Sequence, residues 1–227
     1  MMRWTALLVI ASAFGQIPLE KQSAIGRGLA ADVERQWSLL ADARVTQYIH
    51  TLTGKLEPGF PMQVRVIDRA EPRAIAIPGA YLYVSSGLIV HAQTEAELAG
   101  VLAHEIAHIA ASAGSQTMFM VDSGLCNRFS DAALLPVGYL PTQRGFERDA
   151  DLLGVEYLSK AGYDPRALVD FFERMKLEEG VSADARARAA QLSAAKQDYI
   201  VTSSQFVEAQ ARINALSPPR RPPSLLP

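Results

Sequence analysis

Residues 102–111, LAHEIAHIAA, place His104 and His108 four positions apart, with Glu105 directly after the first histidine. On an α-helix, residues i and i+4 lie about 40° apart around the axis and about 6 Å apart along it, so both imidazoles can point at one metal ion. Glu105 is rotated by about 100° from His104, so it flanks such an ion and can accept a proton from a bound water. The other positions are small or apolar, which predicts a buried helix. The same stretch also fits a core helix whose histidines are satisfied by ordinary hydrogen bonds.

A catalytic zinc site needs a third protein ligand, and the composition restricts which residue types can provide it. The chain has four histidines, none of them after His108, and a single cysteine, Cys126. The sequence therefore predicts a carboxylate ligand. FERDADLLG, residues 146–154, supplies Glu147 and, four positions later on the same helical face, Asp151. Glu147 can complete a His-His-Glu set, and Asp151 can accept a hydrogen bond from the far nitrogen of a ligating histidine. An ordinary charged helix face is the alternative.

Hydrophobic periodicity predicts a series of helices with one β-rich region among them. Two strand-like runs cover 62–68 and 74–89, and Pro78-Gly79 interrupts the second. Thr94 and Glu97 form a capping-box pattern, which predicts that the HExxH helix begins there. The predicted helices cover 19–56 with a break near Asp42, 94–111, a stretch from Pro141 to Gly162, 165–179 and 183–197.

HExxH followed by E-x-x-A-D on a later helix resembles the zinc metallopeptidases of the CAAX prenyl protease, HtpX and BepA group, which are gluzincins. Three further stretches are similar to this group: EKQSAIGRGLAADVERQ, AIAIPGAYLYVSSGLI and AGYDPRALVDFFERM. The resemblance covers about residues 19–180. It implies a zincin-like metallopeptidase domain of the α+β class, mainly helical, with a small β-sheet next to the HExxH helix.

The resemblance also implies the roles of individual residues. One zinc ion per chain is expected, bound by His104, His108 and Glu147, with Asp151 orienting a ligating histidine. Glu105 is expected to act as general base, because it can remove a proton from the water that zinc acidifies. The strand after Pro78-Gly79 is expected to lie at the edge of the sheet and to hold a polypeptide substrate by pairing with its backbone. This predicted substrate strand consists of Ala80, Tyr81, Leu82, Tyr83 and Val84.

One departure from the group leaves two functions open. Many soluble relatives carry a His-Pro pair near the C-terminus, whereas the comparable stretch here, VTSSQFVEAQARINAL, has no histidine. Tyr199 and Arg212 are candidates to replace it, and a structural role is the alternative for both. The first function is a zinc endopeptidase acting on unfolded or damaged envelope or secreted proteins. The second is a non-proteolytic, zinc-stabilised binding or chaperone-like module. His50 and His91 are interpreted as bystanders, because three ligands are already assigned.

The N-terminus predicts export from the cytoplasm. Arg3 precedes a short apolar run with small-residue cleavage sites, which is typical of a signal peptide over 1–16, and an uncleaved anchoring helix is the alternative. The metallopeptidase domain is expected over 17–200. The mature protein is then expected to be periplasmic or secreted, and no later apolar run is long enough to span a membrane.

The remaining segments carry weaker signals. Residues 201–227 are expected to form a C-terminal segment that ends in a disordered, proline-rich tail, for which the sequence identifies no partner. Residues 112–141 connect the two metal-bearing helices and are interpreted as a lid over the cleft or a plain loop. A net charge of −2 argues against nucleic acid as a partner and leaves polypeptide substrates as the expected ones.

Overall fold

A computed structural model describes residues 19–114, 121–122, 140–175, 180–196 and 198–216. The predicted signal peptide, the proline-rich tail and most of the segment 112–141 lie outside these residues, so those predictions are not tested. Within the described part, the chain forms α1 (Leu19–Gln36), α2 (Ala43–Lys55), β1 (Gln63–Ile67), β2 (Ala74–Ile77), β3 (Tyr81–Ser85), α3 (Ser86–His91), α4 (Glu95–Gly114), β4 (Val121–Asp122), α5 (Leu140–Lys160), α6 (Arg166–Met175), α7 (Ala183–Ala195) and α8 (Ser204–Leu216). The predicted mainly helical α+β fold is confirmed.

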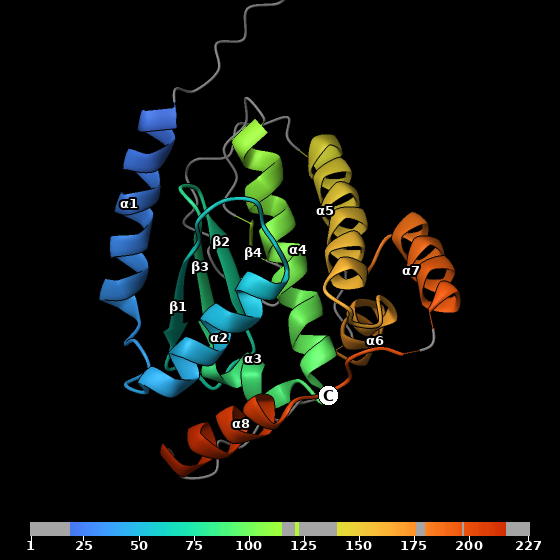
Figure 1. Ribbon diagram of the computed structural model, residues 1–227. Coiled ribbons are helices and arrows are strands. Elements are labelled where there is room, and N and C mark those ends of the chain that lie inside the picture. Colours follow the sequence, from blue (N-terminus) through green and yellow to red (C-terminus); the bar gives the residue numbers. More distant parts are fainter. Residues whose placement is uncertain (1–18, 115–120, 123–139, 176–179, 197, 217–227) are drawn as a thin grey trace, which may run out of the picture.

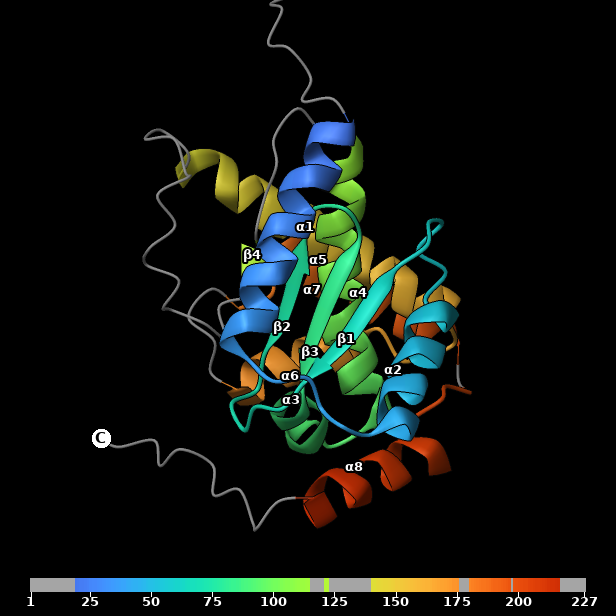
Figure 2. The ribbon, with the colours of Figure 1, turned by 90° about the vertical axis from the view of Figure 1, so that its left-hand side faces the viewer.

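The strands form one mixed sheet in the order β1-β3-β2-β4 (Figure 2). β1 runs parallel to β3, whereas β2 is antiparallel to both β3 and β4. The predicted strand over 74–89 is therefore two strands followed by a helix. The strand ends at Ser85 because its hydroxyl accepts a hydrogen bond from Leu88 N at 3.0 Å and caps α3.

The predicted position of the substrate strand is wrong. β3 lies inside the sheet, where Tyr83 is aligned with Arg65 on one side and with Ile75 on the other. A strand with two neighbours has no free backbone groups with which to pair a peptide. Ala80 lies in the preceding turn, with a positive φ of 65°, and its carbonyl already accepts from Gln63 N. The prediction of an edge strand that binds substrate is therefore wrong for all its residues, which are Ala80, Tyr81, Leu82, Tyr83 and Val84.

Helices cover both faces of the sheet. Figure 1 shows α1 on one side of the strands and α4 on the other. Side chains alternate accordingly along β3, because Tyr83 packs in a small cluster with α1, while Leu82 and Val84 belong to the main core. On β2, Ala74 and Ala76 are buried and small. The central strands are therefore buried on both faces, which fixes the sheet beneath α4.

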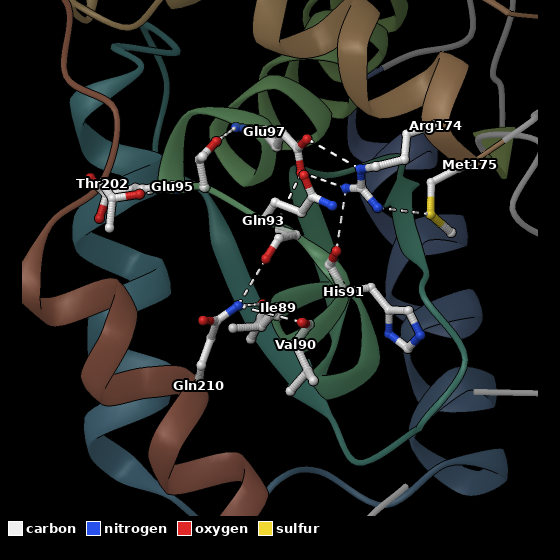
Figure 3. A network of polar contacts seen from close by, with 12 residues as sticks. Ile89, Val90, His91, Gln93, Glu95, Glu97, Arg174, Met175, Thr202 and Gln210 are labelled. Atoms are coloured by element: carbon white, nitrogen blue, oxygen red, sulfur yellow. Dashed lines mark hydrogen bonds and ion pairs between the residues drawn. The ribbon is translucent and has the colours of Figure 1, made fainter. Parts of the chain in front are cut away.

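Polar contacts hold the start of α4 (Figure 3). Thr94 caps the helix as predicted, because its Oγ1 accepts from Glu97 N at 3.1 Å. The Glu97 carboxylate accepts from Gln93 N at 2.7 Å, one residue before the N–H that a standard capping box uses. Arg174 of α6 donates to Glu97 Oε2 at 2.5 Å and to His91 O at 3.3 Å. Arg174 therefore joins α6 to two helices that are consecutive in the chain, α3 and α4.

The C-terminal helix α8 belongs to the same domain, so the predicted boundary at residue 200 is wrong. Phe206, Ala209 and Ile213 of α8 are buried in the main core. Gln210 donates to the carbonyls of Ile89 and Ala92, each at 2.9 Å (Figure 3). The domain therefore continues to the end of α8. No helix in the described part of the chain is long and apolar enough to cross a membrane.

Candidate metal centre

The helices that carry the two motifs, α4 and α5, lie side by side (Figure 1). Gly154 of α5 makes this approach possible. A Cβ atom at Gly154 would lie 3.2 Å from both the Cα and the backbone N of His104. Such a contact is tighter than an ordinary van der Waals contact, and the atoms on the other side are backbone, which cannot rotate away. The absence of a side chain therefore brings the HExxH helix within reach of Glu147.

Three predicted ligands converge on one point. His104 Nε2 lies 3.0 Å from His108 Nε2, and Glu147 Oε2 lies 3.4 Å from each of these two nitrogens. The two histidines are buried, and the Glu147 side chain is 21% exposed. Among the described residues, this is the only group of three histidine, cysteine or carboxylate side chains placed to hold a metal ion. Glu147 is thus the most exposed of the three side chains.

The donor set and its spacing fit zinc. Zinc bonds to imidazole nitrogen and carboxylate oxygen are about 2.1 Å long, so donor atoms on a tetrahedral zinc lie about 3.4 Å apart. The observed separations of 3.0, 3.4 and 3.4 Å are close to that value. Two imidazoles and one carboxylate leave one position of a tetrahedron for a water or a substrate atom, as a catalytic site requires.

Asp151 lies where it can orient His104. Its Oδ1 is 3.1 Å from His104 Nδ1, and the residue is only 3% exposed. A proton held on Nδ1 by a carboxylate leaves the lone pair of Nε2 directed at the metal position. The second oxygen, Oδ2, accepts a hydrogen bond from the backbone N–H of Ser182 at 2.7 Å.

The electrostatics of the centre favour positive charge. Burial by itself lowers the pKa of His104, but the Asp151 and Glu147 carboxylates outweigh it and raise that pKa to about 10. Burial by itself raises the pKa of Glu147, but hydrogen bonds from His104 and His108 lower it to about 2. Burial also lowers the pKa of His108. The Glu147 carboxylate thus stays ionised and stabilises a cation at the point where the three donors meet.

Two more residues complete the surroundings. Glu105 follows His104 on α4 and is fully buried. Phe172 of α6 lies against the His104 ring, with 5.5 Å between the ring centroids and 55° between the ring planes, which restricts the rotation of that ring. Sequence reasoning missed Phe172 and the Ser182 N–H, because both come from elements that reach the centre only through tertiary packing.

The other candidate residues make contacts elsewhere. His91 Nδ1–H donates to Gly87 O at 2.8 Å, and His50 lines a separate pocket of about 260 Å³ beside α2 and β1. Tyr199 donates to Leu192 O at 2.8 Å, and Arg212 forms an ion pair with Asp42 at 2.8 Å. Within the described residues, none of them belongs to the group of metal donors.

Comparison with known proteins identifies relatives that are proteases by name. The chain is 25% identical to the beta-barrel assembly-enhancing protease of Yersinia pestis, in a match that covers 86% of this chain and 50% of that protein. It is 31% identical to the putative beta-barrel assembly-enhancing protease of Vibrio cholerae (60% of this chain, 34% of that protein). It is 29% identical to the mitochondrial metalloendopeptidase OMA1 of Schizosaccharomyces pombe, in a match that covers 75% of this chain and 53% of that protein.

The chain therefore spans at most about half the length of these relatives. The sequence model of peptidase family M48 matches residues 40–217, which include α4, α5 and all the residues of the metal centre. This match confirms the resemblance to zinc metallopeptidases. The family match covers most of the chain, and the HExxH helix meets Glu147 as a metallopeptidase requires. The chain therefore belongs to peptidase family M48.

Proposed function

We propose that this chain is a zinc-dependent endopeptidase, with His104, His108 and Glu147 as metal ligands and Glu105 as general base. The observation that carries the proposal is the triangle of ligand atoms, with sides of 3.0, 3.4 and 3.4 Å. Two of its corners, His104 and His108, lie on the helix that also holds the buried Glu105, and Glu147 of α5 supplies the third. The names of the relatives, which are proteases and a metalloendopeptidase, support the same reaction.

The chemistry divides between the ion and the side chains. A zinc ion at this centre would act as a Lewis acid that polarises the substrate carbonyl and makes a water molecule more acidic. Glu105 would accept the proton of the attacking water and then deliver it to the nitrogen of the leaving amine. Asp151 would hold His104 in the tautomer that binds metal, and Phe172 would limit the movement of the His104 ring.

As substrates we propose unfolded or damaged proteins of the cell envelope or secreted proteins, with the enzyme outside the cytoplasm. Support comes from the relatives named for enhancing β-barrel assembly and from the signal-like residues 1–16. Activity on a reduced and alkylated protein, compared with the same protein in its native fold, tests this substrate class. Equal cleavage of both forms would contradict it.

A zinc-stabilised binding module without proteolytic activity is the competing function. Residues 201–216, the stretch expected to carry a late histidine in this group, contain none. They form α8 and the three residues before it, and α8 packs on α2 and α3. Within the described residues, the centre thus has three protein donors and no fourth.

Glu105→Gln separates the two functions. The full chain loaded with zinc is assayed on casein, with zinc content measured in parallel. We expect one zinc per chain in both proteins and an activity about 10²–10⁴-fold lower in the variant, because the glutamine cannot accept a proton. Glu208→Gln makes the same chemical change on an exposed position of α8 and serves as the control. Equal activity of wild type and Glu105→Gln, with zinc bound in both, would show that the enzyme proposal is wrong.

A further inference from the structure

We infer that the peptide group between Val181 and Ser182 positions Asp151, and through Asp151 orients His104 for metal binding. The inference rests on the proposed zinc site and concerns a segment to which no role is otherwise assigned. The Ser182 N–H donates to Asp151 Oδ2 at 2.7 Å, while Asp151 Oδ1 lies 3.1 Å from His104 Nδ1. The two carboxylate oxygens thus face different groups: Oδ2 accepts a hydrogen bond from the start of α7, and Oδ1 lies at ion-pair distance from Nδ1 of the metal ligand.

Two partners on different oxygens fix the plane of a carboxylate, whereas one partner leaves it free to rotate. Asp151 is only 3% exposed, so bulk water is a poor replacement for the backbone donor. A rotated Asp151 would move its Oδ1 away from His104 Nδ1, which it approaches to 3.1 Å. The ring of His104 would then lose the contact that aims its Nε2 at the metal position.

The same peptide group is also held at its carbonyl end. Arg186 Nε donates to Val181 O at 2.9 Å, and the Arg186 guanidinium forms an ion pair with Glu173 of α6. Because a peptide unit is planar, fixing the C=O of Val181 also fixes the direction of the Ser182 N–H. Gly180, with a φ of +50°, makes the turn that leads into this peptide group.

The helix that follows packs against the helix that carries Asp151. α7 lies beside α5 (Figure 1). It is joined to α5 by two ion pairs, Arg148–Asp184 at 2.8 Å and Arg188–Glu156 at 2.6 Å. Ala185 and Ala189 of α7 are fully buried against the core. The start of α7 is therefore held beside Asp151 mainly by the packing of these two alanines, because an exposed pair such as Arg148–Asp184 contributes little.

The contact involves the backbone of Ser182 and not its side chain. Ser182 precedes the first residue of α7, but its hydroxyl makes no capping hydrogen bond, and it has no hydrogen-bond partner among the described residues. Ser182 is therefore a positioning residue through its N–H. A proline is the substitution that removes this group, and the Ser182 φ of −58° is one that proline adopts.

The test is the zinc affinity of the full chain, measured by competition with a chromophoric chelator. We expect Ser182→Pro to bind zinc about tenfold more weakly, the low end of the effect of removing a partner outside the ligand shell. Ser182→Ala keeps the N–H and should bind zinc as the wild type does. Ala183→Pro is the matched control, because it places proline at the exposed first residue of α7, where proline is favourable, and leaves the Ser182 N–H intact.

A double-mutant cycle separates positioning from a general loss of structure. In an Asp151→Ala background, Ser182→Pro should leave the zinc affinity unchanged, since the contact it removes no longer exists. A purely structural effect would lower the affinity by the same factor in both backgrounds, and that result would overturn the inference. The d–d spectrum of the cobalt-substituted protein should change in Ser182→Pro and not in Ala183→Pro.

Two outcomes distinguish this inference from the proposed function. If the wild type binds no zinc, the proposed site is wrong and the inference falls with it. If the wild type binds zinc and Ser182→Pro binds it equally well, only the inference is wrong. Should Ser182→Pro fail to fold, Arg186→Leu releases the same peptide group from its carbonyl side, and an unchanged zinc affinity in that variant would also overturn the inference.

Discussion

Single residues decide the geometry of the metal centre, and Gly154 shows the effect most directly. It has no part in the chemistry, yet a side chain there would meet the backbone of His104 at 3.2 Å. This contact sets the distance between α4 and α5. The same distance places Glu147 Oε2 at 3.4 Å from the Nε2 atoms of His104 and His108. The spacing of the donors therefore depends on a residue that cannot itself bind metal.

We expect Gly154→Val to reduce the free energy of unfolding by about 1–3 kcal/mol, because the added atoms force two backbones apart. Zinc affinity should fall in the same variant. Gly145→Val is the control on the same helix, since a Cβ at Gly145 meets no atom within 4 Å. It should change the stability by less than about 0.5 kcal/mol. Chemical unfolding of both variants measures the difference, and equal stabilities would contradict the prediction.

At the scale of the element, α8 is joined to the start of α2 by an ion pair. Asp42 caps α2 by accepting hydrogen bonds from Arg44 N and Val45 N, each at 3.0 Å. Its carboxylate also accepts from Arg212 of α8, with the closest contact at 2.8 Å. The hydrogen bond from Arg212 is the largest effect on the pKa of Asp42 and, against the effect of burial, holds that pKa below its usual value of 3.8. Docking of α8 thus depends on the charge of this carboxylate.

This pKa predicts how an Arg212→Gln variant responds to acid. Because the pKa of Asp42 is lower in the folded state, the ion pair contributes its full stability above about pH 4, and that contribution is lost as the pH falls through the folded pKa. We therefore expect the variant to be less stable than the wild type at pH 7, and the gap to close below pH 4. Urea unfolding of the zinc-free proteins at several pH values measures this gap.

Arg44→Gln is the control for the charge change. Arg44 also joins α2 to α8, through Glu208 at 3.3 Å, but both side chains are more than half exposed. Exposed ion pairs contribute little, so this variant should be about as stable as the wild type at every pH. A gap for Arg212→Gln that stays constant from pH 7 to pH 3 would show that the Asp42 charge is not involved.

At the scale of the whole molecule, the metal centre joins two helices separated by the segment 115–139. His104 and His108 come from α4 and Glu147 comes from α5. A metal held by all three is a cross-link that exists only in the folded protein. Metal binding should therefore stabilise the entire domain, not only the centre.

We expect removal of zinc by a chelator to lower the melting temperature of the wild type. With free zinc at about 1,000 times its dissociation constant, binding contributes about 4 kcal/mol, which corresponds to roughly 10 °C for a domain of this size. Differential scanning calorimetry with zinc and with chelator measures the shift. His108→Ala lacks one ligand and should melt at nearly the same temperature under both conditions. A wild type that behaves in the same way would contradict the proposed zinc site.

The sequence alone determined the features that depend on local geometry. Histidines four apart share a helix face wherever the helix lies, and Glu147 and Asp151 obey the same rule. Helix limits such as the capping residue Asp42 follow from hydrogen bonds between near neighbours along the chain, so the sequence predicts them well. The mainly helical fold and the family followed from these local patterns together.

Only the tertiary structure decided which elements lie next to one another. β3 has the composition of a strand, but its neighbours are chosen by packing against α1, α2 and α4, which is why its place inside the sheet was not predictable. α8 became part of the core in the same way. The Ser182 N–H left no trace in the sequence, because every residue except proline carries this group and only long-range packing brings it to Asp151.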